Sequence, residues 1–131
     1  MKYLTLILLF LFIFAYCSFS APVPEPFFKA LHQVETSGRL GPIRGSAGEL
    51  GPFQIRMAYW KDSGVKGSFP QCSDLTYSKR VVEAYLNRYC PKAVQAHDYE
   101  QMARVHNGGP AGMKVSSTVG YWRKVQKVLY R

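Results

Sequence analysis

The sequence predicts a mainly α-helical single domain. Apolar residues make up 47% and aromatic residues 15% of the chain, which is too rich in core-forming side chains for a disordered or low-complexity segment. Apolar side chains recur at helical spacing in short stretches separated by Gly and Pro. The 131 residues fit one domain. We therefore expect about five short helices around a Gly-rich loop or small hairpin.

The first twenty residues have the pattern of a secretory signal peptide. A positively charged start is followed by an apolar run over residues 4–16, which is shorter than the roughly 20 residues needed to span a bilayer. Ser18 and Ser20 supply the small residues that precede a cleavage site. The sequence therefore predicts a signal peptide at 1–20, a secreted domain at 21–131, and no stable membrane anchor after cleavage. An uncleaved signal anchor is the alternative.

The first predicted helix begins at Phe27, because Phe27, Leu31 and Val34 recur at spacings of four and three residues. It ends near Gly38, a residue type that commonly terminates helices. The segment Gly41–Gly51 follows and contains four glycines, which makes it too flexible for a helix. We expect a tight loop or a small hairpin there.

Four more helices are predicted beyond this loop. One covers residues 57 to about 64, and another follows a Ser or Asp cap at 73–74 and continues to a break at Pro91. Asp98, followed by Gln three residues later, resembles the capping box of a short helix. The segment 107–110 (Asn-Gly-Gly-Pro) predicts a break, and a last helix starts near residue 118.

The cysteine pattern agrees with export. Cys17 leaves with the signal peptide, so that Cys72 and Cys90 remain as an even pair. Secretion favours a disulfide between them, and two unpaired thiols are the alternative. No CxxC or HxxxH spacing occurs, so we expect neither a metal site nor a cofactor.

Among the eight carboxylates of the chain, Glu35 is the candidate for acid catalysis. It lies at the end of the first predicted helix, beside Val34, and the Gly-rich loop follows at once. Desolvation and the helix dipole both favour the neutral carboxylic acid at such a place. A neutral acid can protonate a glycosidic oxygen. On spacing alone, an ordinary surface glutamate is the favoured interpretation.

Five short motifs occur in the order of one family. They are ETSG at 35–38, GPFQI at 51–55, YWxD at 59–62, ARxHNGGP at 103–110 and GYW at 120–122. The chain resembles the invertebrate-type (destabilase-like) lysozymes and is similar to lytic transglycosylase-like domains of the lysozyme superfamily. The resemblance implies a lysozyme-like α+β fold that is mainly helical. It also implies hydrolysis of the β-1,4 bond between N-acetylmuramic acid and N-acetylglucosamine in peptidoglycan.

The resemblance assigns roles to individual residues of the motifs. Glu35 matches the family's general acid. Gln54 matches a residue that lines the sugar cleft. His106 and Asn107 match the motif at the edge of the saccharide subsites, and Tyr59 is a further candidate for substrate binding.

Structural alternatives exist for most of these residues. Gln54 could bond the backbone of its own loop, and Asn107 could adopt the left-handed conformation of a turn. The spacing of Tyr59 is also that of a core residue. Tyr121 and Trp122 are interpreted as core packing.

A second catalytic carboxylate is the point where the chain departs from the family pattern. The family carries an Asp between the catalytic Glu and the GxxQI motif, but residues 40–50 contain none, and Arg44 or Gly45 occupies the expected position. Glu49 is the acid of this segment and becomes the candidate nucleophile or base. The alternative is a surface charge that pairs with Arg44. Without a second carboxylate, the substrate's acetamido group could attack, which would give either a hydrolase or an anhydro-forming lytic enzyme. An inactive binder is the remaining alternative.

The charge balance points to an anionic partner. The chain has 17 Lys and Arg against 8 Asp and Glu, a formal net charge of +9. Bacterial walls are polyanionic, so this charge suits a peptidoglycan-cleaving enzyme of antibacterial or digestive use. A non-catalytic cationic wall-binding or antimicrobial protein is the alternative. Nucleic acid is not an expected partner because the basic residues match no nucleic-acid-binding motif, and we expect a monomer.

The signal-peptide interpretation predicts the start of the mature chain. Cleavage after Ser20 should leave Ala21 as the first residue of the secreted protein, because small residues precede this bond. N-terminal sequencing of protein collected from the culture medium checks this. A secreted chain that retains Met1 would contradict it.

Overall fold

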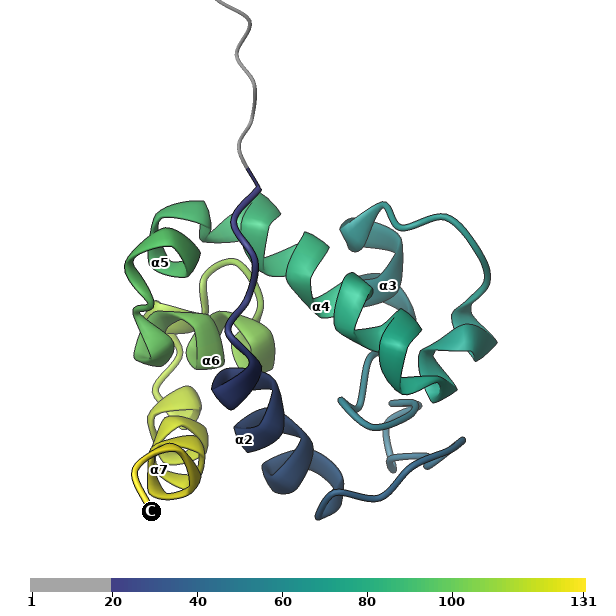
Figure 1. Cartoon of the computed structure of the whole chain (residues 1–131), viewed down its shortest axis with the longest axis horizontal. Coiled ribbons are helices and arrows are strands. Elements are labelled where there is room, and N and C mark those ends of the chain that lie inside the picture. The colour runs from purple at the N-terminus through teal and green to yellow at the C-terminus, as the bar shows by residue number, and fades with distance from the viewer. Residues whose placement is uncertain (1–19) are drawn as a thin grey trace, which may run out of the picture.

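The computed structural model describes residues 20–131, and the predicted signal peptide lies outside the described residues except for Ser20. The described part contains six α-helices, two 3-10 helices and no named strand (Figure 1). They are α2 (Glu25–Thr36), α3 (Met57–Ser63), η1 (Phe69–Ser73), α4 (Leu75–Tyr89), α5 (Pro91–Ala96), α6 (Tyr99–Gly108), η2 (Gly112–Lys114) and α7 (Ser117–Leu129). No helix in residues 20–131 is long and apolar enough to cross a membrane.

The predicted fold class is confirmed, and α2, α3, α4, α6 and α7 correspond to the five predicted helices. Two predicted caps are also present. The Asp74 carboxylate accepts a hydrogen bond from the Tyr77 backbone N–H (2.7 Å), and the Asp98 carboxylate accepts one from the Gln101 N–H (3.1 Å). Each cap satisfies a backbone donor that the first helical turn leaves free.

Proline accounts for two differences from the predicted helices. Pro91 was expected to end or break a helix, yet it also begins α5, which the sequence analysis missed. Helix α2 starts at Glu25, two residues before the expected Phe27, with Pro26 in its first turn. Proline fits the first turn of a helix because its missing N–H would have no partner there.

The Gly-rich segment folds back on itself without forming named strands. Isolated antiparallel bridges pair Leu50 with Arg44 and with Ile55, which gives the tight loop that was predicted. Gly51 has a φ of 78°, and a side chain at this position would overlap the backbone carbonyl of Cys72. The loop therefore approaches η1 closely because residue 51 is glycine.

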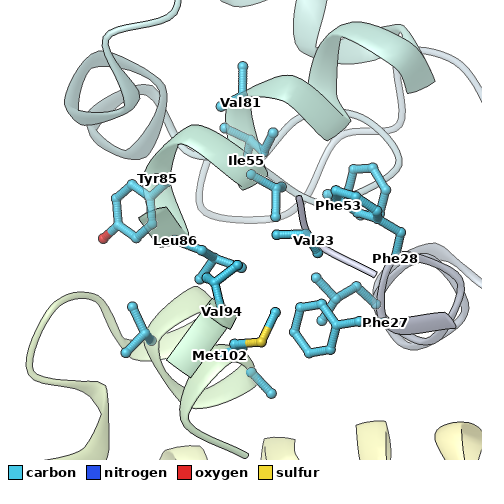
Figure 2. Close-up of a cluster of buried hydrophobic side chains, with 14 of the residues drawn as sticks. Val23, Phe27, Phe28, Phe53, Ile55, Val81, Tyr85, Leu86, Val94 and Met102 are labelled. Carbon is cyan, nitrogen blue, oxygen red and sulfur yellow. The ribbon is translucent and has the colours of Figure 1, made fainter. Parts of the chain in front are cut away.

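A continuous apolar core joins the helices to this loop. Figure 2 shows Phe27 from α2, Phe53 from the loop, Leu86 from α4 and Met102 from α6 meeting in one cluster. All four side chains are fully buried. Burial of this apolar surface is the main favourable contribution to folding, and it fixes the loop against α2.

Helix α7 packs against both α2 and α6 (Figure 1). Arg104 of α6 holds α7 in place, since its guanidinium donates hydrogen bonds to the Thr118 hydroxyl (2.9 Å) and to the Met113 carbonyl (2.9 Å). The same guanidinium also pairs with Glu100 (3.0 Å). These contacts bring the GYW motif of α7 to the end of α2.

The predicted disulfide is wrong. Cys72 lies in η1, before α4, whereas Cys90 caps the C-terminal end of α4. The 15 residues of α4 span about 22 Å at ~1.5 Å per residue, whereas a disulfide requires Cα atoms within about 7 Å. Both thiols are free and buried. Burial raises the pKa of each thiol to about 11.

Two protected thiols are therefore expected in the chain that starts at Ala21. In the native protein at pH 8, Cys72 and Cys90 should react very slowly with Ellman's reagent, because both are buried and remain protonated below a pKa of about 11. In guanidinium chloride, both should react at once. Unfolded protein that releases no thiolate without a reductant would indicate a disulfide and contradict the structure.

Candidate functional site

A cleft of about 500 Å³ lies between the end of α2, the Gly-rich loop, α3 and α6. All six residues predicted for catalysis or substrate binding line it: Glu35, Glu49, Gln54, Tyr59, His106 and Asn107. Segments far apart in the sequence therefore contribute to one site. Among residues 20–131, no cluster of three or more His, Cys, Asp or Glu residues could hold a metal ion.

The position of Glu35 is set by the end of α2. The helix stops at Thr36, and Ser37 adopts a left-handed conformation with a φ of 56°. The buried Thr36 hydroxyl lies 3.1 Å from the Pro52 carbonyl oxygen, within hydrogen-bonding distance. This contact joins the ETSG and GPFQI motifs, so that Glu35 faces the Gly-rich loop.

One oxygen of the Glu35 carboxyl group contacts the protein, and the other does not. The Tyr121 hydroxyl donates a hydrogen bond to Oε1 (2.6 Å), and Nε2 of His106 lies 3.5 Å from the same oxygen. Oε2 has no hydrogen-bond partner among residues 20–131. The side chain is 18% exposed. Glu35 is thus shielded on one side and keeps one oxygen for a ligand in the cleft.

Tyr121 was predicted only as a core residue. Its ring does pack against the core, but its hydroxyl reaches Glu35, a contact that the sequence analysis missed. The residue type could have indicated such a contact, because a tyrosine on a partly buried helix face carries a hydroxyl that needs a hydrogen-bond partner. The sequence of α7 alone did not indicate that this partner is Glu35.

His106 and Tyr59 form the wall beside Glu35. The imidazole Nδ1 of His106 lies 2.9 Å from the Tyr59 hydroxyl, and His106 is only 8% exposed. The Tyr59 ring stacks on Tyr85, with ring centroids 3.6 Å apart. Desolvation raises the pKa of Tyr59 well above its ordinary value, and the neighbouring Tyr85 adds to this rise. Tyr59 is therefore a neutral phenol that both packs and lines the cleft.

Asn107 lies within α6, which continues to Gly108. The left-handed turn considered for Asn107 is therefore wrong, and the chain instead turns at Gly109, which has a φ of 82°. Because Asn107 is exposed and lines the cleft, its amide is accessible to a ligand.

Glu49 is held as an anion on the loop. Hydrogen bonds from backbone N–H groups, its own and that of Ala47 (2.9 Å), lower the pKa of Glu49, and Arg56 lowers it further. Arg56 donates two hydrogen bonds to Oε1, at 3.0 and 3.2 Å. Pairing with Arg44 was the alternative considered from the sequence, and it is wrong because the partner is Arg56.

Gln54 has a structural role beside its position in the cleft. Its backbone is left-handed (φ 50°), and its side-chain amide donates to the carbonyls of Ile43 (3.1 Å) and Gly51 (3.0 Å). A Cβ at Gly45 would overlap both the Glu49 carboxylate and the Gln54 side-chain carbonyl. The space beside position 45, where the family pattern places an acid, is therefore filled by Glu49.

The family model for Destabilase matches residues 28–128. The chain belongs to the Destabilase family. The resemblance drawn from the motifs is thus confirmed, and it extends over most of the described residues.

Curated relatives and solved structures agree with this assignment. The chain is 46% identical over 78 residues to Lysozyme 1 of Crassostrea virginica, covering 58% of this chain and 42% of that protein. It is 40% identical over 98 residues to the invertebrate-type lysozyme of Ruditapes philippinarum, covering 70% and 72%. The inhibitor-bound lysozyme of Meretrix lusoria superposes with a TM-score of 0.69 at 32% identity, covering 82% of this chain and 91% of that one. The matches to the first three relatives span 42%, 66% and 58% of their lengths.

The crowding at Gly45 generates a prediction for this Destabilase-family chain. Gly45→Ala should displace the Glu49 carboxylate, since the new methyl group would take its place. The atoms that must move are at the ends of the flexible Glu49 and Gln54 side chains, so the unfolding free energy should change by less than about 1 kcal/mol. Cleavage of peptidoglycan, the reaction that the resemblance implies, should fall on the order of 10- to 100-fold.

Thermal unfolding and turbidity assays of peptidoglycan suspensions measure these two effects. Gly120→Ala is the matched control, because the space around Gly120 is open and it lies within α7. It should keep the full rate and be equally or slightly more stable. A Gly45→Ala protein with full activity would show that the position of Glu49 does not matter.

Proposed function

We propose that the chain is a secreted muramidase, a glycoside hydrolase that cleaves the β-1,4 bond between N-acetylmuramic acid and N-acetylglucosamine in bacterial peptidoglycan. The observation that carries the proposal is Glu35, whose carboxyl group lines a cleft of about 500 Å³ and has one oxygen without a hydrogen-bond partner in residues 20–131. Membership of the Destabilase family and the relatives named lysozyme support the same reaction.

Glu35 acts as the general acid in this proposal. A proton leaves its carboxyl group for the glycosidic oxygen as the C–O bond breaks. The carboxylate that forms is met by the Tyr121 hydroxyl and by the imidazole of His106, both of which lie against Oε1. Donors already in place stabilise the developing charge without reorganisation, which lowers the barrier.

Glu49 supplies the second carboxylate. Its lowered pKa keeps it anionic, and it faces the same cleft as Glu35. The guanidinium of Arg56 and the N–H of Ala47 occupy its two oxygens, which reduces its strength as a nucleophile. We therefore assign it to stabilising the positive charge of the sugar or to orienting the attacking water, rather than to covalent attack.

The charge and the predicted export suit an enzyme that acts outside the cell, and the proposed form is a monomer. The full sequence has a net charge of +9, and Lys2 is the only charged residue in the predicted signal peptide, so the secreted domain stays strongly basic and is attracted to polyanionic bacterial walls. The wall is then both the surface that concentrates the enzyme and its substrate. Antibacterial defence and digestion of bacteria both require this activity.

Carboxyl-to-amide substitutions test the two roles. Glu35→Gln should lose at least about 10²–10⁴-fold in rate, because an amide has no acidic proton to donate. Glu49→Gln should lose less, because the charge it removes assists the reaction but does not transfer the proton. Counting reducing ends and anhydro ends released from purified peptidoglycan measures the rate and separates hydrolysis from the lytic reaction.

Glu25→Gln is the matched control. Glu25 pairs with Lys79 at the start of α2, has a side chain that is 55% exposed, and does not line the cleft. It should cleave at the wild-type rate. A folded Glu35→Gln protein with full activity would refute the proposal. Bacterial killing that survives in this variant while cleavage is lost would instead favour the non-catalytic cationic function.

A further inference from the structure

Three side chains from three helices converge on one side of Glu35. Tyr121 of α7 and His106 of α6 both lie beside Oε1 of Glu35. Tyr59 of α3 contacts the opposite ring nitrogen of His106. We propose that Tyr121 is a positioning residue that fixes the acidic proton of Glu35 on Oε2, with His106 and Tyr59 completing the arrangement. This inference rests on the proposed function, because it concerns how that acid works.

The direction of the Tyr121 hydrogen bond follows from its surroundings. Desolvation raises the pKa of Tyr121 well above its ordinary value, and the nearby Glu35 raises it further, so the phenol keeps its hydrogen. Among residues 20–131, the hydroxyl has Glu35 Oε1 as its partner, at 2.6 Å. If the Tyr121 hydroxyl instead accepted a hydrogen bond from Glu35, its own hydrogen would lack an acceptor in a desolvated place. Tyr121 therefore donates to Oε1.

The hydrogen-bond partner of Tyr59 likewise assigns the tautomer of His106. The Tyr59 hydroxyl is protonated, and its partner among residues 20–131 is Nδ1 of His106, at 2.9 Å. Tyr59 therefore donates to Nδ1, and a neutral imidazole then carries its hydrogen on Nε2. Nε2 lies 3.5 Å from Glu35 Oε1. The Nε2–H of His106 is thus close to the oxygen that Tyr121 already contacts, at a distance too long for a strong hydrogen bond.

These two donors decide where the carboxyl proton lies. A proton on Oε1 would face the hydrogens of Tyr121 and His106, so the neutral acid carries its proton on Oε2. In the reaction, the O–H bond at Oε2 breaks and a new O–H bond forms on the leaving glycosidic oxygen. The electron pair of the broken C–O bond goes to that oxygen, and Glu35 becomes a carboxylate. Tyr121 is not among the residues that line the cleft, so it acts through Glu35.

Tyr121→Phe tests this inference on two kinds of substrate. With peptidoglycan, whose sugar leaving group needs a proton, kcat should fall between about 10-fold and 100-fold with little change in KM, a smaller loss than removal of the acid itself. With a 2,4-dinitrophenyl chitooligosaccharide, whose leaving group needs no proton, kcat should stay within about twofold of wild type. A defect in folding would lower both rates equally.

Tyr130→Phe is the matched control, since Tyr130 lies at the end of the same helix and is 69% exposed. It should behave as wild type with both substrates. Equal losses of Tyr121→Phe on both substrates, together with a lower Tm, would reduce the contact to a structural link between α2 and α7. Wild-type rates on both would also overturn the inference. Wild-type protein that cleaves neither substrate would instead refute the proposed function on which it rests.

Discussion

The burial of Phe53 is the interaction on which the site depends. Its ring is fully buried and packs against Phe28 and His32 of α2, with centroids 5.7 and 5.8 Å apart. Its two neighbours serve the cleft, because Pro52 accepts from Thr36 at the end of α2 and Gln54 holds the loop backbone. A flexible Gly-rich segment is thereby fixed against the helix that carries the acid. Apolar packing thus sets the geometry of a polar site.

The two carboxylates of the cleft are kept in different environments. Within residues 20–131, Glu35 has Tyr121 and His106 beside one carboxyl oxygen, and the other oxygen has no hydrogen-bond partner. Glu49 is bound by Arg56 and by backbone N–H groups, which hold it as an anion. In the proposed reaction, these separate environments suit different tasks, with Glu35 giving a proton and Glu49 keeping a charge. The loop that lacks the family's Asp thus still supplies a charged oxygen to the cleft.

The core carries the stability that disulfides supply in many small secreted domains. Cys72 and Cys90 contribute to this core as buried thiols at opposite ends of α4 rather than as a crosslink. Helix α7 is held by packing and by the hydrogen bonds of Arg104 to Thr118 and to the backbone before it. Within the described residues, the last helix is therefore held against α2 and α6 by packing and hydrogen bonds rather than by a disulfide.

Local periodicity and short motifs were enough to predict the helical class, the Asp98 cap, a cap at Ser73 or Asp74, and six of the residues that line the cleft. The order of the motifs also led to the correct family, with Glu35 and Gln54 in the cleft. Local rules were less reliable at proline, where a residue that ends one helix also begins α5. Whether a new helix starts at Pro91 depends on how the turn that follows it packs against the rest of the chain.

Which side chains meet became known only from the packing of the helices. Tyr121 reaches Glu35 across 86 residues of sequence, and Arg56 rather than Arg44 pairs with Glu49. The distance between Cys72 and Cys90 is likewise set by the straight helix between them, which an even cysteine count does not reveal. Such partners are chosen by the packing of whole helices, so residue type and spacing along the chain cannot specify them.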